Sequence, residues 1–156
     1  MKRHVHLQTL SRQHHNGLLI ALLVNKGLKK NARLITICEF IHYNWQQDLQ
    51  EHFRLEEEIL IPALANKPFD SSLTDRLLQE HTEISELVNR LTSPVPEIKD
   101  VERFSHLLEQ HIRFEERVYF PAAEKVLTEQ ELEQVGALLH DKEEHNCITY
   151  PVKFWE

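Results

Sequence analysis

The sequence predicts an all-α fold, an up-down-up-down antiparallel four-helix bundle with an additional short C-terminal helix. The composition is the first reason. The 156 residues include only three Gly and six Pro, and Leu, Glu, Gln, Lys and Arg, which favour helix, are abundant. The second reason is the order of long segments with helical periodicity, joined by short connections that imply antiparallel neighbours. A chain of this length fits a single domain, residues 1–156.

The first two predicted helices form a hairpin. The first helix should cover about residues 7–30, with His14 and Leu22 on its apolar stripe. After a short connection, the second should cover about residues 32–64. Pro62 falls near its end, where it would shape or end the helix. The predicted inner face of the second helix contains Ile35, Cys38, His42, Trp45, Leu49, His52, Glu56 and Ile59.

A linker at residues 66–72 separates this hairpin from the next, and Asp70 or Ser71 is the expected N-cap of the third helix. That helix should cover about residues 72–92 and carries His81 on its apolar stripe. A break at Ser93-Pro94-Val95-Pro96 precedes the fourth helix, and the bundle as a whole should span about residues 7–126.

The fourth helix should cover about residues 97–126. A capping box of Thr128 and Glu131 begins the extra helix, expected at about residues 128–145. We expect the tail, residues 150–155, to fold back on the bundle. The chain thus reads as one helical hairpin used twice.

One sequence pattern is repeated in the second and fourth predicted helices. The stretch HFRLEEEILIPA at residues 52–63 returns as HIRFEERVYFPA at residues 111–122. The His, the Arg, the first two Glu, the Pro and the Ala are identical, and apolar residues face apolar ones between them. Each copy alone resembles an ordinary solvated pair on a helix surface, and the repetition is what indicates a site.

The spacing of the repeated His and Glu has a chemical meaning. Residues four apart on an α-helix lie about 40° round and about 6 Å along, so their side chains point the same way. Imidazole and carboxylate converging from two facing helices form a mixed nitrogen and oxygen metal site, and buried carboxylates require a compensating cation. The candidate metal ligands are His14, His52, Glu56, His81, His111 and Glu115.

Several other polar residues are less clearly placed. The sequence leaves open whether any of four further residues reaches the metal: His15, His42, Glu57 and Glu116. Three histidines are assigned to the surface: His106, His140 and His145.

Charge and composition exclude several classes of protein. The formal net charge of -7 argues against a nucleic-acid binder, which would carry a clustered basic face. The longest wholly apolar segment, Leu18–Val24, is too short to span a bilayer, and Met1–His6 has no apolar core behind it, as a signal peptide would. We therefore expect a cytoplasmic protein without membrane partners, in which Cys38 and Cys147 are reduced thiols.

The order of these motifs resembles the hemerythrin-like, or HHE cation-binding, proteins, and in particular their bacterial single-domain branch. The resemblance covers about residues 7–126. Three phrases carry it: Ser11-Arg-Gln-His14-His15, Glu51-His52-Phe-Arg-Leu-Glu56-Glu57-Glu and Arg113-Phe-Glu115-Glu116-Arg.

This resemblance implies a cofactor of two iron ions with an oxo or hydroxo bridge, although imidazole and carboxylate accommodate Mn and Zn as well. Glu56 and Glu115 would bridge the metals, and the four histidines would be terminal ligands. The oxygen-carrying hemerythrins of invertebrates have a further His where this chain has Ser85, and an Asp five residues after the last His where this chain has Glu115 four after it. Fewer imidazoles leave open positions on the metals.

The expected function is therefore a non-haem di-iron protein that binds dioxygen, nitric oxide or a peroxide for sensing, storage or stress protection. The chain also resembles the di-iron repair proteins of the nitrosative stress response, and this resemblance implies a second possibility, the repair of iron centres or the delivery of iron. A di-iron redox enzyme is a third, but ferritin-like oxidases use Glu-x-x-His, and His-Glu-x-x-His is absent. No residue is assigned a catalytic role. The remaining alternative is a metal-free bundle whose histidines pack or sense pH.

Overall fold

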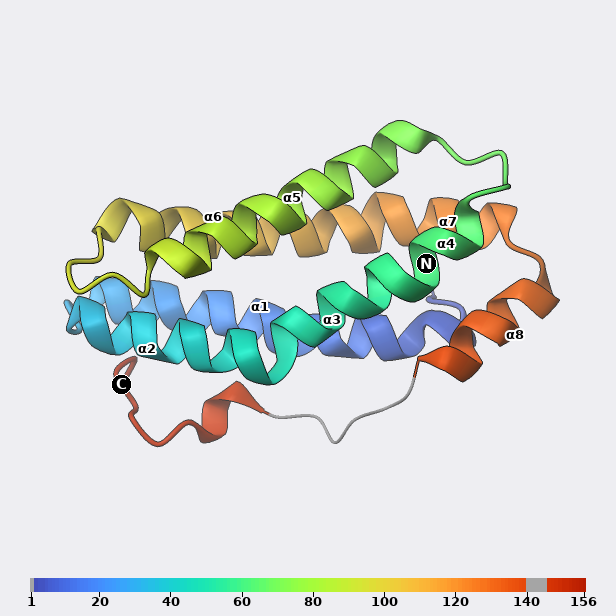
Figure 1. Ribbon diagram of the computed structural model, residues 1–156. Coiled ribbons are helices and arrows are strands. Elements are labelled where there is room, and N and C mark those ends of the chain that lie inside the picture. Colours follow the sequence, from blue (N-terminus) through green and yellow to red (C-terminus); the bar gives the residue numbers. More distant parts are fainter. Residues whose placement is uncertain (1, 140–145) are drawn as a thin grey trace.

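The structure is a computed structural model that describes residues 2–139 and 146–156 (Figure 1). Within these residues all regular structure is helical, as the sequence predicts, and no strand occurs. The α-helices are α1 (Gln8–Lys29), α2 (Leu34–Asn44), α3 (Gln50–Leu55), α4 (Ile61–Leu64), α5 (Ser71–Arg90), α6 (Ile98–Phe114), α7 (Phe120–Val126) and α8 (Glu129–Leu138). Short 3-10 turns form at η1 (Val5–Leu7) and η5 (Cys147–Thr149). Among the described residues, none of the helices is both long enough and apolar enough to cross a membrane.

Three π-helical turns lie within two long, continuous helices. In the first of these, α2, α3 and α4 are joined by η2 (Trp45–Leu49) and η3 (Glu56–Leu60); in the second, η4 (Glu115–Tyr119) joins α6 to α7. After each turn a backbone N–H donates to the carbonyl five residues earlier, as from Ile61 to Glu56 and from Phe120 to Glu115. The two carboxylates of the repeated pattern therefore begin widened turns.

The repeated prolines give a physical reason for two of these turns. Pro62 and Pro121 lie two residues after the last residues of η3 and η4. A proline inside a helix has no N–H to donate, and its ring crowds the carbonyl four residues earlier. A widened turn relieves this crowding, so the two helices continue past the prolines to Leu64 and Val126.

The long helices pack side by side along their lengths (Figure 1). Helix α1 contacts α2 and α6, and α5 contacts α6. Their apolar residues form two separate clusters, one containing Ile20, Phe40 and Phe104, the other containing Leu10 and Tyr119. Because members of both clusters come from every long helix, the clusters lie at successive levels of the bundle, with polar residues of the chain between them.

The predicted helix boundaries rest on identifiable caps. Asn31 adopts the left-handed conformation, with φ of 57°, and Ala32 N–H donates to Gly27 O, which closes α1. Asp70 is the N-cap of α5, because its side chain accepts a hydrogen bond from Ser72 N–H. The capping box of Thr128 and Glu131 is present at the start of α8.

Three details of the sequence prediction are wrong or incomplete. Leu22 and Ile35 were expected on inner faces, but their exposed fractions are 49% and 43%. Leu22 lies at the edge of its stripe, and the π turn η2 changes the helical phase between Ile35 and His52. The extra helix ends at Leu138 because Leu139 leaves helical geometry. Its predicted extension through residues 140–145, and the assignment of His140 and His145 to the surface, lie outside the described residues.

The C-terminal tail folds back on the bundle, as expected, and lies along α2 in Figure 1. The ring of Phe40 in α2 contacts those of Tyr150, Phe154 and Trp155, with centroid distances of 5.1, 5.0 and 5.6 Å. Cys147 N–H donates to Asn16 Oδ1 at 3.0 Å. Cys38 and Cys147 are buried and free, which agrees with their prediction as thiols.

The tail depends on a close approach to α1, and this gives a first prediction. A Cβ atom at Gly27 would lie 2.6 Å from Phe154 Cδ2 and 3.3 Å from Ile37 Cδ1. Gly27→Ala should therefore lower the free energy of unfolding by about 1–2 kcal/mol, because overpacking outweighs the gain in helix propensity. Thermal denaturation measures the change.

Gly17→Ala is the matched control, since its Cβ would meet only flexible side-chain ends, Cδ1 of Ile112 at 2.7 Å first. Equal stability of the Gly27→Ala variant and the wild-type protein would contradict the importance of this contact.

Candidate metal centre

The structure brings the six predicted ligands into one buried cluster. Each long helix contributes: His14 comes from α1, His52 from α3, Glu56 from η3, His81 from α5, His111 from α6 and Glu115 from η4. All six residues are buried, and none is more than 5% exposed. The cluster lies where the two apolar clusters of the bundle meet, so apolar residues exclude water on both sides of it.

The ligand atoms of these residues form two groups, each suited to one metal ion. One group contains His14 and His52, the other contains His81 and His111, and Glu56 and Glu115 belong to both. Within each group the ligand atoms lie within 4.8 Å of one another. The two groups therefore share both carboxylates, those of Glu56 and Glu115.

The Glu56 carboxylate extends between the two groups. Its Oε2 lies 3.4 Å from His52 Nε2, and its Oε1 lies 3.1 Å from His81 Nε2. Each of its oxygens thus faces a histidine of a different group.

Glu115 uses a single oxygen for the same purpose. Its Oε1 lies 3.0 Å from His14 Nε2 and 3.2 Å from His111 Nε2. Together the two carboxylates touch all four histidines at the same ring atom, Nε2.

The other ring nitrogen of each histidine faces outward to a polar partner. His81 Nδ1 lies 2.8 Å from Glu57 Oε2, and His14 Nδ1 lies 3.1 Å from Glu116 Oε2. Because an ionised carboxylate only accepts hydrogen bonds, Nδ1 donates in these pairs. The unprotonated Nε2 is then left facing the carboxylates, which is the tautomer that binds metal.

His52 and His111 are held in the same way by residues from neighbouring helices. His52 Nδ1 lies 2.6 Å from Gln13 Oε1, and His111 Nδ1 lies 2.8 Å from Glu80 Oε1. Gln13 directly precedes His14, and Glu80 directly precedes His81.

The donor set fits cations, since several buried atoms at its centre have no hydrogen-bond partner. These orphaned atoms are Glu56 Oε1 and Oε2, Glu115 Oε2, His81 Nε2 and His111 Nε2. In addition, the Nε2 atoms of His14 and His52 lie only 3.0 Å apart. In the tautomer that has only Nδ1 protonated, the Nε2 lone pairs face other lone pairs and carboxylate oxygens. A cation between them then removes both the repulsion and the cost of leaving polar atoms unpaired.

The electrostatics of the metal-free cluster lead to the same conclusion. Burial, followed by the charge of Glu115, raises the pKa of Glu56 well above its usual range. Burial alone would also raise the pKa of Glu115, but the charge of His111 and the close approach of Glu56, His111 and His14 to its carboxylate lower it well below that range. Two buried carboxylates at this spacing thus do not both ionise without more positive charge.

The structure locates the four residues for which the sequence left open whether they reach the metal. Glu57 and Glu116 bond the outer nitrogens of His81 and His14 and belong to neither group of ligand atoms. His15 is exposed, and His42 lines surface grooves near Trp45 and Thr92. The exposed position of His106 agrees with its prediction.

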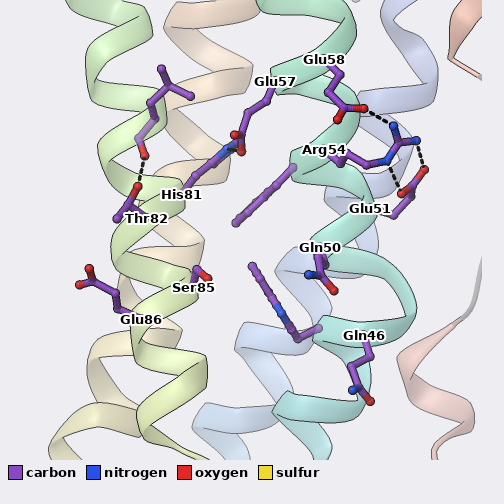
Figure 2. Close-up of a pocket in the computed structure, with 13 residues that line it drawn as sticks. Gln46, Gln50, Glu51, Arg54, Glu57, Glu58, His81, Thr82, Ser85 and Glu86 are labelled. Atoms are coloured by element: carbon purple, nitrogen blue, oxygen red, sulfur yellow. Dashed lines mark hydrogen bonds and ion pairs between the residues drawn. The ribbon is translucent and has the colours of Figure 1, made fainter.

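A groove between the α2–α4 helix and α5 leads to the cluster (Figure 2). Its volume is about 610 Å³, and His81 and Glu57 line it. The Phe53 ring, also part of the lining, stacks on the His81 ring at a centroid distance of 3.8 Å. Ser85 lies on the α5 side, one turn beyond His81, where its short side chain leaves room. Arg54, on the opposite side, is paired with Glu51 and Glu58.

Taken together, these features define a class: helical proteins with a buried cluster of histidines and shared carboxylates suited to cations. Comparison of the sequence with protein families identifies the particular family. The chain belongs to the hemerythrin HHE cation-binding domain family, whose sequence model matches residues 6–123. Comparisons with curated proteins and with solved structures found no match.

Proposed function

We propose that the protein is a non-haem di-iron protein that binds dioxygen, nitric oxide or a peroxide, and that it serves in sensing, storage or stress protection. One observation carries the proposal: two groups of four buried ligand atoms share the carboxylates of Glu56 and Glu115. Membership of a cation-binding family supports it. The proposed ligands are His14, His52, Glu56, His81, His111 and Glu115.

Iron, when bound, would supply reversible change between Fe2+ and Fe3+ and open positions for a small ligand. The chain's own contribution is to fix the donors. Hydrogen bonds at Nδ1 hold each imidazole with Nε2 inward, and such outer partners orient the ligands and strengthen them as donors. The apolar clusters on either side limit water around the site. Exclusion of water suppresses side reactions of a bound small molecule with solvent.

The groove at His81 supports a small ligand as the physiological partner. It leads from the surface to the stacked rings of Phe53 and His81, and Ser85 leaves space beside them. A diatomic molecule or a peroxide needs only a narrow passage past the Phe53 ring to reach the cluster.

The proposal also includes the topology of the bundle, the number of domains and the location of the protein. We take the four long helices to run alternately up and down, and the chain to act as one domain in the cytoplasm. The net charge of -7 favours a function without nucleic acid.

The metal content of the purified protein tests the proposal. We expect untagged protein, isolated in air, to contain two irons per chain, one for each group of ligand atoms, with charge-transfer bands that bleach on reduction. Elemental analysis and visible spectroscopy measure both, and nitric oxide added to the reduced protein without air should produce a new absorption. A folded protein that contains no iron and takes up no Fe2+ without air would contradict the proposal.

A further inference from the structure

The four outward hydrogen bonds of the cluster differ in one respect that the internal repeat makes clear. Three of the acceptors are carboxylates and one is an amide: Glu57, Glu80 and Glu116 against Gln13. Gln13 and Glu80 occupy equivalent places, because each precedes the histidine of its own helix and bonds the histidine of the next helix. The repeat is thus symmetric in geometry but not in charge.

As a result, the two groups of ligand atoms have different numbers of outer carboxylates. The group of His81 and His111 is held by two carboxylates, Glu57 and Glu80. The group of His14 and His52 is held by one carboxylate, from Glu116, and by the Gln13 amide. The bridging carboxylates, Glu56 and Glu115, are common to both groups and do not distinguish them.

An outer carboxylate and an outer amide act differently on an imidazole. A carboxylate that accepts the Nδ1–H bond draws the proton outward, so that Nε2 becomes a better electron donor, and it adds a negative charge close to the cation. An amide oxygen accepts the same bond without a net charge. Changes to such partners alter metal affinity by roughly 10- to 100-fold.

We propose that Gln13 makes the two metal positions unequal, so that the position of His81 and His111 takes up the first divalent cation and the position of His14 and His52 takes up the second, more weakly. This inference rests on the ligand set of the proposed function. Gln13 is a positioning residue in this scheme, because it acts through His52 and does not itself belong to either group of ligand atoms.

The test is a titration of the metal-free protein with Co2+ without air, followed by calorimetry and by visible absorption. Repulsion between the two cations would by itself make the second binding step weaker than the first. The wild-type titration therefore cannot test the role of Gln13, and the variants are needed. In Gln13→Glu the weaker step should tighten roughly 10-fold and approach the stronger one. In Glu80→Gln the stronger step should weaken by a similar factor, because this exchange is the mirror of the first.

A third variant tests the order of filling. In Gln13→Glu with Glu80→Gln the first equivalent of Zn2+ should move from the His81 and His111 position to that of His14 and His52, as followed by NMR of the histidine ring nitrogens. Circular dichroism checks that each variant is folded. Gln13 and Glu80 are partly buried, and Gln and Glu side chains have the same length, so each exchange should be accommodated.

The outcomes separate the two proposals. A weaker step that is unchanged in Gln13→Glu, or an unchanged order of filling in the double variant, would overturn the inference and leave the metal site standing. Wild-type protein that binds no Co2+ would overturn the proposed function and the inference together.

Discussion

Replacement of His111 by alanine is expected to abolish tight metal binding and to cost about 3–5 kcal/mol of the free energy of unfolding, as for the loss of one partner from a buried ion pair. His111 is fully buried, and its two ring nitrogens bond Glu80 and face Glu115. Its pKa is raised to about 9. Burial opposes this rise, but the nearby charge of Glu115, which lies against Nε2, and the hydrogen bond that Nδ1 donates to Glu80 outweigh it. The metal-free protein therefore uses the His111 charge to balance that of Glu115.

His106→Ala is the matched control, since His106 lies on the same helix, α6, with an exposed side chain. It should change neither metal content nor stability by a measurable amount. Elemental analysis and chemical denaturation report the two effects. Two metals per chain in the His111→Ala variant would show that the ligand assignment is wrong.

The second large effect is expected for Glu56→Gln, which should weaken metal binding while leaving the stability of the metal-free protein almost unchanged. Burial and the charge of Glu115 raise the pKa of Glu56 well above its usual range, which favours the neutral form of its side chain in the metal-free protein. Gln matches the neutral form of this side chain in shape and charge, so Glu56→Gln should change the metal-free stability by less than about 1 kcal/mol. Metal content should fall from two to at most one, because both groups of ligand atoms include Glu56.

Glu58→Gln provides the comparison, because Glu58 lies in the same π turn, is exposed, and pairs with Arg54 outside the cluster. We expect it to keep both metals. Metal stoichiometry and thermal denaturation with and without metal distinguish the variants. If Glu56→Gln retained two metals with wild-type affinity, the shared carboxylate would have no role in binding.

The sequence was sufficient for the helical fold and for the six residues of the cluster, and the reason is the repeat. His and Glu four apart on an apolar face predict their own direction from helical geometry alone. Two copies of that pattern then predict two helices that face each other. Periodicity therefore located His52, Glu56, His111 and Glu115 without knowledge of the tertiary structure.

The outer partners could not be predicted so directly. Gln13 and Glu80 bond histidines of other helices, and helical spacing contains no information about contacts between helices. A signal did exist for them: both directly precede a predicted ligand, at matching positions of the two hairpins. The π turns could not be predicted either, because they depend on which carbonyl each backbone N–H selects as its partner. The only sequence signal for the turns at Glu56 and Glu115 is the proline that follows each of them.

The sharing of Glu56 and Glu115 has a mechanical consequence. The first half of the bundle, residues 8–64, supplies His14, His52 and Glu56 to the cluster, and the second half, residues 71–126, supplies the other three residues. Each group of ligand atoms takes one carboxylate from the opposite half, so neither half contains a complete group. Two ions bound at the proposed site would therefore cross-link the two halves of the chain, and separation of the halves would require the release of both ions.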